Sequence, residues 1–96
     1  MTCVLAIDQG TTGTTCLMIA DNGQVRARAY REITQHFPAP GWVEHDPHEI
    51  LEKTLSAARE AIAAAGETPA AVGITNQRET IVLWERATGR AVHRAI

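Results

Sequence analysis

Short apolar segments and polar turns alternate through the first third of the chain. Segments 2–7 and 14–20 are apolar and β-branched, which favours strands, and a polar turn at 9–13 separates them. Asp21-Asn22-Gly23 predicts a second hairpin turn, because Asn and Gly tolerate positive φ. Residues 24–33 then alternate with period two, as a half-solvated strand does. The pattern predicts a three-stranded antiparallel meander.

A loop over 34–46 leads into a predicted helix. Asp46 is the expected N-cap, Pro47 the first helical residue, and Glu49 lies three residues after the cap. Gly66 is expected to end the helix. The predicted apolar face consists of residues at helical spacing, namely Leu51, Leu55, Ala58, Ile62 and Ala65.

The remaining pattern predicts further strands. Residues 71–75 read as a buried strand and 80–85 as another, followed by a turn at 86–89 and a final run that pairs back. The order is therefore βββ-α-β-β. A right-handed crossover through the helix would make the 71–75 strand parallel to its neighbour. We expect a mixed α/β sheet with a helix on at least one face.

Composition excludes several classes of protein. Nine Lys+Arg against eleven Asp+Glu give a net charge of −2, with no basic patch for nucleic acid. No apolar run is long enough to cross a bilayer. The two cysteines read as small buried hydrophobes of a reducing compartment. The sequence stops within a strand-like run, so we expect residues 1–96 to be one partial, truncated domain, the alternative being a terminal edge strand.

The turn between the first two strands carries the first chemical motif. It contains Asp8 at the strand end, two glycines, and the hydroxyls of Thr11 and Thr12. Glycine lets the backbone approach a ligand closely, successive N–H groups form an anion-binding concavity, and hydroxyls add donors. Asp8 could hold Mg²⁺ directly or through water. The motif lacks the Gly-Lys-Ser/Thr of a Walker A loop, and an ordinary polar hairpin turn is the alternative.

Asn76-Gln77-Arg78-Glu79 forms the second motif. It follows the strand expected to be parallel, and ligands in open α/β sheets bind near the carboxyl ends of strands. Arg78 donates up to five hydrogen bonds and ionised Glu79 accepts them, which suits a small polyol. The alternative is a solvated loop with a surface ion pair of little energetic value.

Residues 36–46 contain histidines and acids, but no zinc-ligand spacing. A structural role is favoured, in which Phe37 and Trp42 anchor the loop over the start of the helix. Trp84 is likewise expected to pack.

Together these motifs closely resemble the glycerol kinase branch of the FGGY carbohydrate kinases, which also include xylulokinases and gluconokinases. The resemblance runs over essentially all 96 residues. It implies a ribonuclease-H-like fold of the actin-like ATPase superfamily, with this chain as the N-terminal part of the first lobe. The matching stretches are Ala6-Ile7-Asp8-Gln9-Gly10-Thr11-Thr12, Pro40-Gly41-Trp42-Val43-Glu44-His45-Asp46-Pro47 and Gly73-Ile74-Thr75-Asn76-Gln77-Arg78-Glu79-Thr80.

The resemblance also implies roles for single residues. It implies that Thr11, Thr12 and Gly13 contact the phosphates of ATP, and that Thr11 lies close to the phosphoryl group of the product. Arg78 and Glu79 would bind glycerol, and Thr11 would line the same glycerol site. Two positions depart from the family pattern: Thr15 stands where an Arg usually touches the nucleotide, and Gly13 replaces the more usual Ser.

The implied enzyme transfers the γ-phosphoryl group of ATP to glycerol with Mg²⁺, in the cytoplasm and as a homo-oligomer, without nucleic acid or membrane partners. Its catalytic base is expected beyond Ile96, so we expect these 96 residues alone to be inactive. The alternatives are another FGGY sugar kinase, a non-enzymatic nucleotide-binding module related to actin, or a degenerate fragment.

Overall fold

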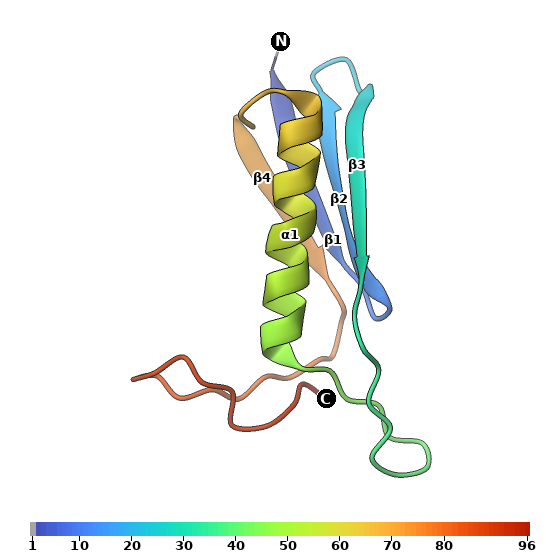
Figure 1. Ribbon diagram of the computed structural model, residues 1–96, viewed down its shortest axis with the longest axis vertical. Coiled ribbons are helices and arrows are strands. Elements are labelled where there is room, and N and C mark those ends of the chain that lie inside the picture. Colours follow the sequence, from blue (N-terminus) through green and yellow to red (C-terminus); the bar gives the residue numbers. More distant parts are fainter. Residues whose placement is uncertain (1) are drawn as a thin grey trace.

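The structure, a computed structural model that describes residues 2–96, is a four-stranded mixed sheet with one helix against one face (Figure 1). The strand order is β3-β2-β1-β4, with β4 parallel to β1 and the other pairs antiparallel. The predicted meander, crossover and mixed α/β class are confirmed. The elements are β1 (Cys3–Gln9), β2 (Gly13–Ala20), β3 (Val25–Glu32), α1 (Pro47–Ala65) and β4 (Ala71–Asn76).

Local signals fix the hairpin between β2 and β3 and both ends of the helix. Gly23 adopts φ 85°, and the Gln24 N–H donates to Asn22 Oδ1 at 2.9 Å. The Asp46 side chain accepts from the backbone N–H of His48 at 2.9 Å, as an N-cap does. Gly66 adopts φ 72° and its N–H donates to the carbonyl of Ile62, which closes the helix.

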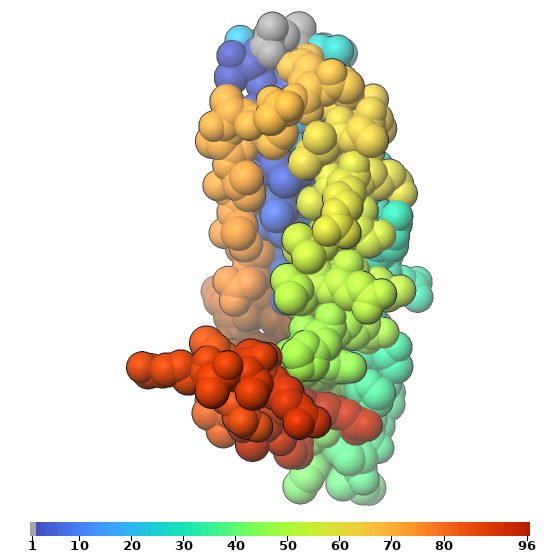
Figure 2. Space-filling view, turned by 60° about the vertical axis from the view of Figure 1, so that its left-hand side comes forward, coloured from blue at the N-terminus to red at the C-terminus, as the bar shows by residue number. Residues whose placement is uncertain are grey.

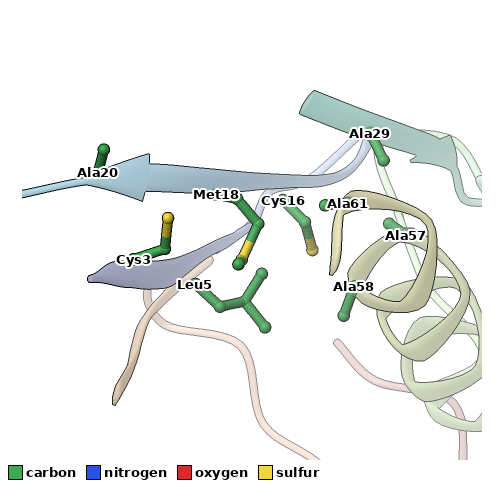
Figure 3. Packing of buried hydrophobic residues seen from close by; sticks show 9 residues of the cluster. All are labelled: Cys3, Leu5, Cys16, Met18, Ala20, Ala29, Ala57, Ala58 and Ala61. Atoms are coloured by element: carbon green, nitrogen blue, oxygen red, sulfur yellow. The ribbon is translucent and has the colours of Figure 1, made fainter. Parts of the chain in front are cut away.

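The core lies between the helix and the first three strands (Figure 3). Small alanines on the helix let it approach the sheet closely. The predicted helical face was therefore partly wrong: Leu51 and Leu55 are 57% and 42% exposed, on the flank of the helix rather than under it. The buried cluster consists of Cys3, Leu5, Cys16, Met18, Ala20, Ala29, Ala57, Ala58 and Ala61.

Polar contacts add to the packing between α1 and the sheet. Thr14 and Thr54 share a hydroxyl hydrogen bond of 3.1 Å, and Arg31 forms a 2.7 Å ion pair with Glu60. Both cysteines are buried and unbridged, as predicted. Burial raises the pKa of the Cys3 and Cys16 thiols, so neither side chain is suited to act as a nucleophile.

The prediction that β4 is buried was wrong. Every residue of β4 is exposed, because α1 covers β1, β2 and β3 and leaves this edge strand uncovered. Figure 2 shows β1 in blue between the orange of β4 and the yellow and green of α1. Val72 and Ile74 accordingly keep 54% and 70% of their surface exposed.

The predicted strand over 80–85 was also wrong. Residues 80–96 form an open hairpin around a turn where Gly89 adopts φ 74°, with an isolated bridge between Trp84 and Ala91 in place of a continuous strand. The final run does pair back as predicted, because Ile81 and Ile96 exchange backbone hydrogen bonds of 3.2 Å.

This hairpin does not join the sheet. Ala95 is buried where it contacts the loop before the helix, but Trp84, which was expected to pack, is 59% exposed. The attachment of the hairpin to the rest of the chain includes the paired backbone hydrogen bonds of His45 and Ala95. Within residues 2–96, no helix is long and apolar enough to cross a membrane.

The aromatic residues of the loop before the helix do not anchor it as predicted. Phe37 is 70% and Trp42 60% exposed. The loop is instead held by backbone hydrogen bonds between His36 and Glu44 in both directions, at 2.9 and 2.8 Å.

Candidate active site

Two polar loops leave the sheet at the same edge, from neighbouring strands. The turn at 10–12 follows β1, and residues 77–79 follow β4 (Figure 1). Gln9 and Asn76 are the last register pair of these parallel strands, and Gln77 Nε2 donates to Gln9 Oε1 at 3.3 Å. The structure thus places the threonines of the turn and the Arg-Glu pair at one edge rather than on opposite sides of the molecule.

Hydrogen bonds to the carbonyl groups of residues 11–13 fix the backbone of the turn and its junction with β2. The Gly10 N–H donates to the carbonyl of Gly13 at 2.8 Å. The Ile33 N–H donates to the carbonyl of Thr12 at 3.0 Å, and the Gln35 side chain to that of Thr11 at 2.6 Å. The side chains of Thr11 and Thr12 are exposed. The backbone of the turn is therefore held by the rest of the chain, while the hydroxyl groups of Thr11 and Thr12 face solvent.

A buried histidine supports the turn through Gln35. His45 is only 5% exposed, and its Nε2 lies 2.9 Å from Gln35 Oε1. Because the Gln35 amide nitrogen already donates to Thr11, its oxygen is the acceptor and His45 Nε2 carries the proton. Sequence reasoning had assigned neither residue to the site. The two contacts join residues that are 10 and 24 positions apart in sequence, which no local pattern indicates.

Gly13 lies where only glycine fits. A Cβ at this position would stand 2.4 Å from the carbonyl oxygen of Arg31 and 2.5 Å from the hydroxyl oxygen of Tyr30. The Tyr30 hydroxyl group also donates to Thr12 Oγ1, at a distance of 3.5 Å. The sequence predicts only a half-solvated strand over residues 24–33, so the contact of Tyr30 with the turn is a second feature that the sequence did not indicate.

Asp8 and Thr15 lie opposite each other in register, on the sheet face away from the helix. Both line an open cavity of about 580 Å³, together with Arg28 and Thr75. Among residues 2–96 there is no cluster of three His, Cys, Asp or Glu side chains that could hold a metal ion. Asp8 therefore offers a single carboxylate, which fits Mg²⁺ only where phosphate oxygens and water supply the other ligands.

Arg78 and Glu79 are both exposed, at the end of β4. Glu79 adopts φ 62°, and it is the one non-glycine residue among residues 2–96 with positive φ. This left-handed conformation costs a residue with a Cβ about 1–2 kcal/mol. Strained backbone of this kind clusters at binding and catalytic sites, which marks the predicted polyol loop as a functional candidate independently of its side-chain chemistry.

Comparison with known proteins decides the family. The N-terminal domain of the FGGY family of carbohydrate kinases matches residues 3–96. The chain belongs to the FGGY family of carbohydrate kinases. It is 54% identical over its whole length to a glycerol kinase of Rhodopseudomonas palustris and 56% identical to one of Bradyrhizobium diazoefficiens. The chain spans 20% of the length of each of these curated relatives.

Solved structures of FGGY kinases share the fold. The chain superposes on Plasmodium falciparum glycerol kinase with ADP at a TM-score of 0.90 and 34% identity, covering all of this chain and 20% of that one. It superposes on xylulose kinase from Rhodospirillum rubrum at 0.91 and 29% identity, covering 98% of this chain and 20% of that one. The fold predicted from the resemblance is therefore confirmed.

Proposed function

We propose that this FGGY chain is the N-terminal part of an ATP-dependent glycerol kinase, which converts glycerol and ATP to sn-glycerol 3-phosphate and ADP. The supporting observation is the placement of the 10–12 turn and the 77–79 loop at one edge of adjacent parallel strands. Phosphoryl transfer depends on positioning two substrates together and stabilising charge. The names of the relatives that are 54% and 56% identical, glycerol kinases in both cases, support the choice of glycerol.

In this proposal the turn binds the nucleotide phosphates. Thr11 and Thr12 donate from exposed hydroxyl groups, and successive backbone N–H groups of the turn, Gly13 included, add donors. Thr15, on the sheet face away from the helix, adds a hydroxyl group but not the positive charge of the Arg that usually stands at this position. Asp8 holds Mg²⁺ directly or through water, because a single carboxylate with phosphate and water ligands suits that ion.

The 77–79 loop binds glycerol. The hydroxyl groups of a polyol both donate and accept hydrogen bonds, and the Arg78 guanidinium and Glu79 carboxylate provide the complementary groups. Thr11, on the turn beside this loop, lies close to the phosphoryl group that is transferred. The catalytic base lies outside these 96 residues, which form one partial domain, and closure of the lobes around both substrates excludes water. Cytoplasmic location and a homo-oligomeric enzyme complete the proposal.

The test uses an assembled kinase, in which this chain replaces the matching N-terminal segment of the Bradyrhizobium diazoefficiens relative. We expect ATP-dependent phosphorylation of glycerol by the assembled kinase, measured as ADP release, and none by the 96-residue chain alone. Robust turnover by the chain alone would contradict the proposal that the catalytic base lies outside these 96 residues.

A panel of xylulose, gluconate and glycerol separates the proposal from its alternatives. Preference for another sugar would favour a different FGGY kinase. Binding of ADP without turnover of any substrate would favour a nucleotide-binding module.

A further inference from the structure

Tyr30 stands on β3 beside the proposed phosphate turn. It is the register partner of Thr15 across β2 and β3, and its hydroxyl lies 3.5 Å from Thr12 Oγ1. The side chain is not part of the buried core, because Tyr30 is 39% exposed. Its hydroxyl group is thus held at the turn and remains accessible to a ligand bound there.

The ring of Tyr30 occupies the space that the glycine leaves free. A Cβ on Gly13 would lie 2.5 Å from the Tyr30 hydroxyl oxygen and 2.6 Å from Cζ. The phenol is therefore seated directly over the backbone of residue 13. A hydroxyl donor reaches the turn from the next strand at the position where residue 13 has no side chain of its own.

We propose that the Tyr30 hydroxyl group is a phosphate-binding donor of the nucleotide site, acting together with the hydroxyl group of Thr12. This inference rests on the proposed function, since it assigns a further ligand to the same phosphate site. An oxygen bound by the Thr12 hydroxyl group lies within reach of the phenol too, because the two hydroxyl oxygens are 3.5 Å apart.

Phosphate binding requires the Tyr30 hydroxyl group to exchange its hydrogen bond to Thr12 for one to the phosphate, and the energies of the two hydrogen bonds favour this exchange. The hydrogen bond from Tyr30 to Thr12, at 3.5 Å, is longer than the usual range for hydroxyl donors and joins two neutral groups, so it is weak. A hydrogen bond to an ionised phosphate oxygen is shorter and roughly twice as strong. When a phosphate binds, the phenol therefore donates to it instead of to Thr12. The Thr12 hydroxyl, which only accepts in the hydrogen bond with Tyr30, can donate its own proton to the same phosphate.

Substitution of the hydroxyl alone tests the inference in the assembled kinase. Tyr30→Phe keeps the ring over Gly13 and removes the donor. We expect the Kd for ADP and the KM for ATP to rise roughly tenfold, as for loss of one hydrogen bond to a charged group. The KM for glycerol and the Kd for adenosine, which has no phosphate, should stay unchanged. Val25→Ala, on the same strand at the end away from the turn, is the matched control and should leave all four values unchanged.

A second pair of variants keeps the test decisive if removal of the phenol harms folding. Tyr30→Gln carries an amide donor and Tyr30→Leu carries none, so we expect tighter ADP binding by the Gln variant. Equal ADP affinity of these two, or of Tyr30→Phe and the parent, would overturn the inference while leaving the proposed function intact. An equal rise in the KM values for ATP and glycerol would overturn it as well, since it would indicate a structural role. A parent that neither binds ADP nor turns over would overturn both proposals together.

Discussion

The 10–12 turn and the 77–79 loop lie at the same edge of the sheet, but they are held very differently. The carbonyl groups of residues 11–13 accept hydrogen bonds from Gly10, Ile33 and Gln35, and the phenol of Tyr30 covers the end of the turn at Gly13. The 77–79 loop follows a strand exposed along its whole length, and its contacts include a 3.3 Å hydrogen bond from Gln77 to Gln9.

This difference separates two ways of building a binding site. The turn sits between two central strands, so the fold of this chain orders it before any ligand arrives. The Arg-Glu loop carries its specificity in exposed side chains and in one left-handed residue, Glu79. We therefore expect changes in the loop to alter binding of one substrate, and changes in the turn to alter stability as well.

The largest expected effect is on the KM for glycerol and comes from the exposed 77–79 loop. In the assembled kinase, Arg78→Ala removes a charged donor from the proposed glycerol site, which is worth up to about 3 kcal/mol. We expect the KM for glycerol to rise roughly a hundredfold, with little change in the KM for ATP. Arg90→Ala, in the exposed hairpin that follows, is the control. Equal increases in both KM values would count against the assignment.

The next effect is on stability and belongs to the turn. Gly13→Ala forces a Cβ against the Arg31 carbonyl and the Tyr30 ring, so overpacking should lower the free energy of unfolding by about 1–3 kcal/mol. Denaturant unfolding measures it. Gly73→Ala is the matched control, because a Cβ there meets nothing within 4 Å. Equal destabilisation by the two variants would show that the close fit at Gly13 is not what matters.

The smallest effect concerns the support behind the turn. Gln35→Ala breaks the hydrogen bond to the Thr11 carbonyl and should cost about 1 kcal/mol, seen as a roughly fivefold rise in the KM for ATP. His45→Ala acts through the same glutamine, so the double variant should be no worse than the stronger single one. Fully additive losses would show that the two residues act independently. Gln24→Ala, in an exposed hairpin turn, is the control.

Local signals in the sequence predicted most of the elements. The Asn22-Gly23 turn and the Asp46 cap act over a few residues, so their consequences can be read directly. Burial could not be read in the same way, since it depends on which elements cover a surface. Leu51 and Val72 are apolar and follow the expected patterns, yet both are exposed. Val72 is exposed because α1 lies over the first three strands only, and Leu51 because it lies on the flank of α1.

The residues of the candidate site also fall into those that local sequence patterns predict and those that only the folded chain brings together. Thr11, Thr12, Arg78 and Glu79 belong to short polar motifs at strand ends, and the topology brings these motifs to one edge. The supporting contacts of Tyr30, Gln35 and His45 depend on strand register and on loops that meet only in the folded chain. Single-sequence patterns carry no signal for such contacts.

The most direct test of the account is a crystal structure of the assembled kinase with ADP and glycerol bound. The account predicts the β-phosphate against the hydroxyls and backbone of residues 11–13, and glycerol within hydrogen-bond distance of Arg78 and Glu79 in the same cleft. A structure with the nucleotide phosphates away from the turn, or with glycerol bound apart from the Arg-Glu pair, would contradict it.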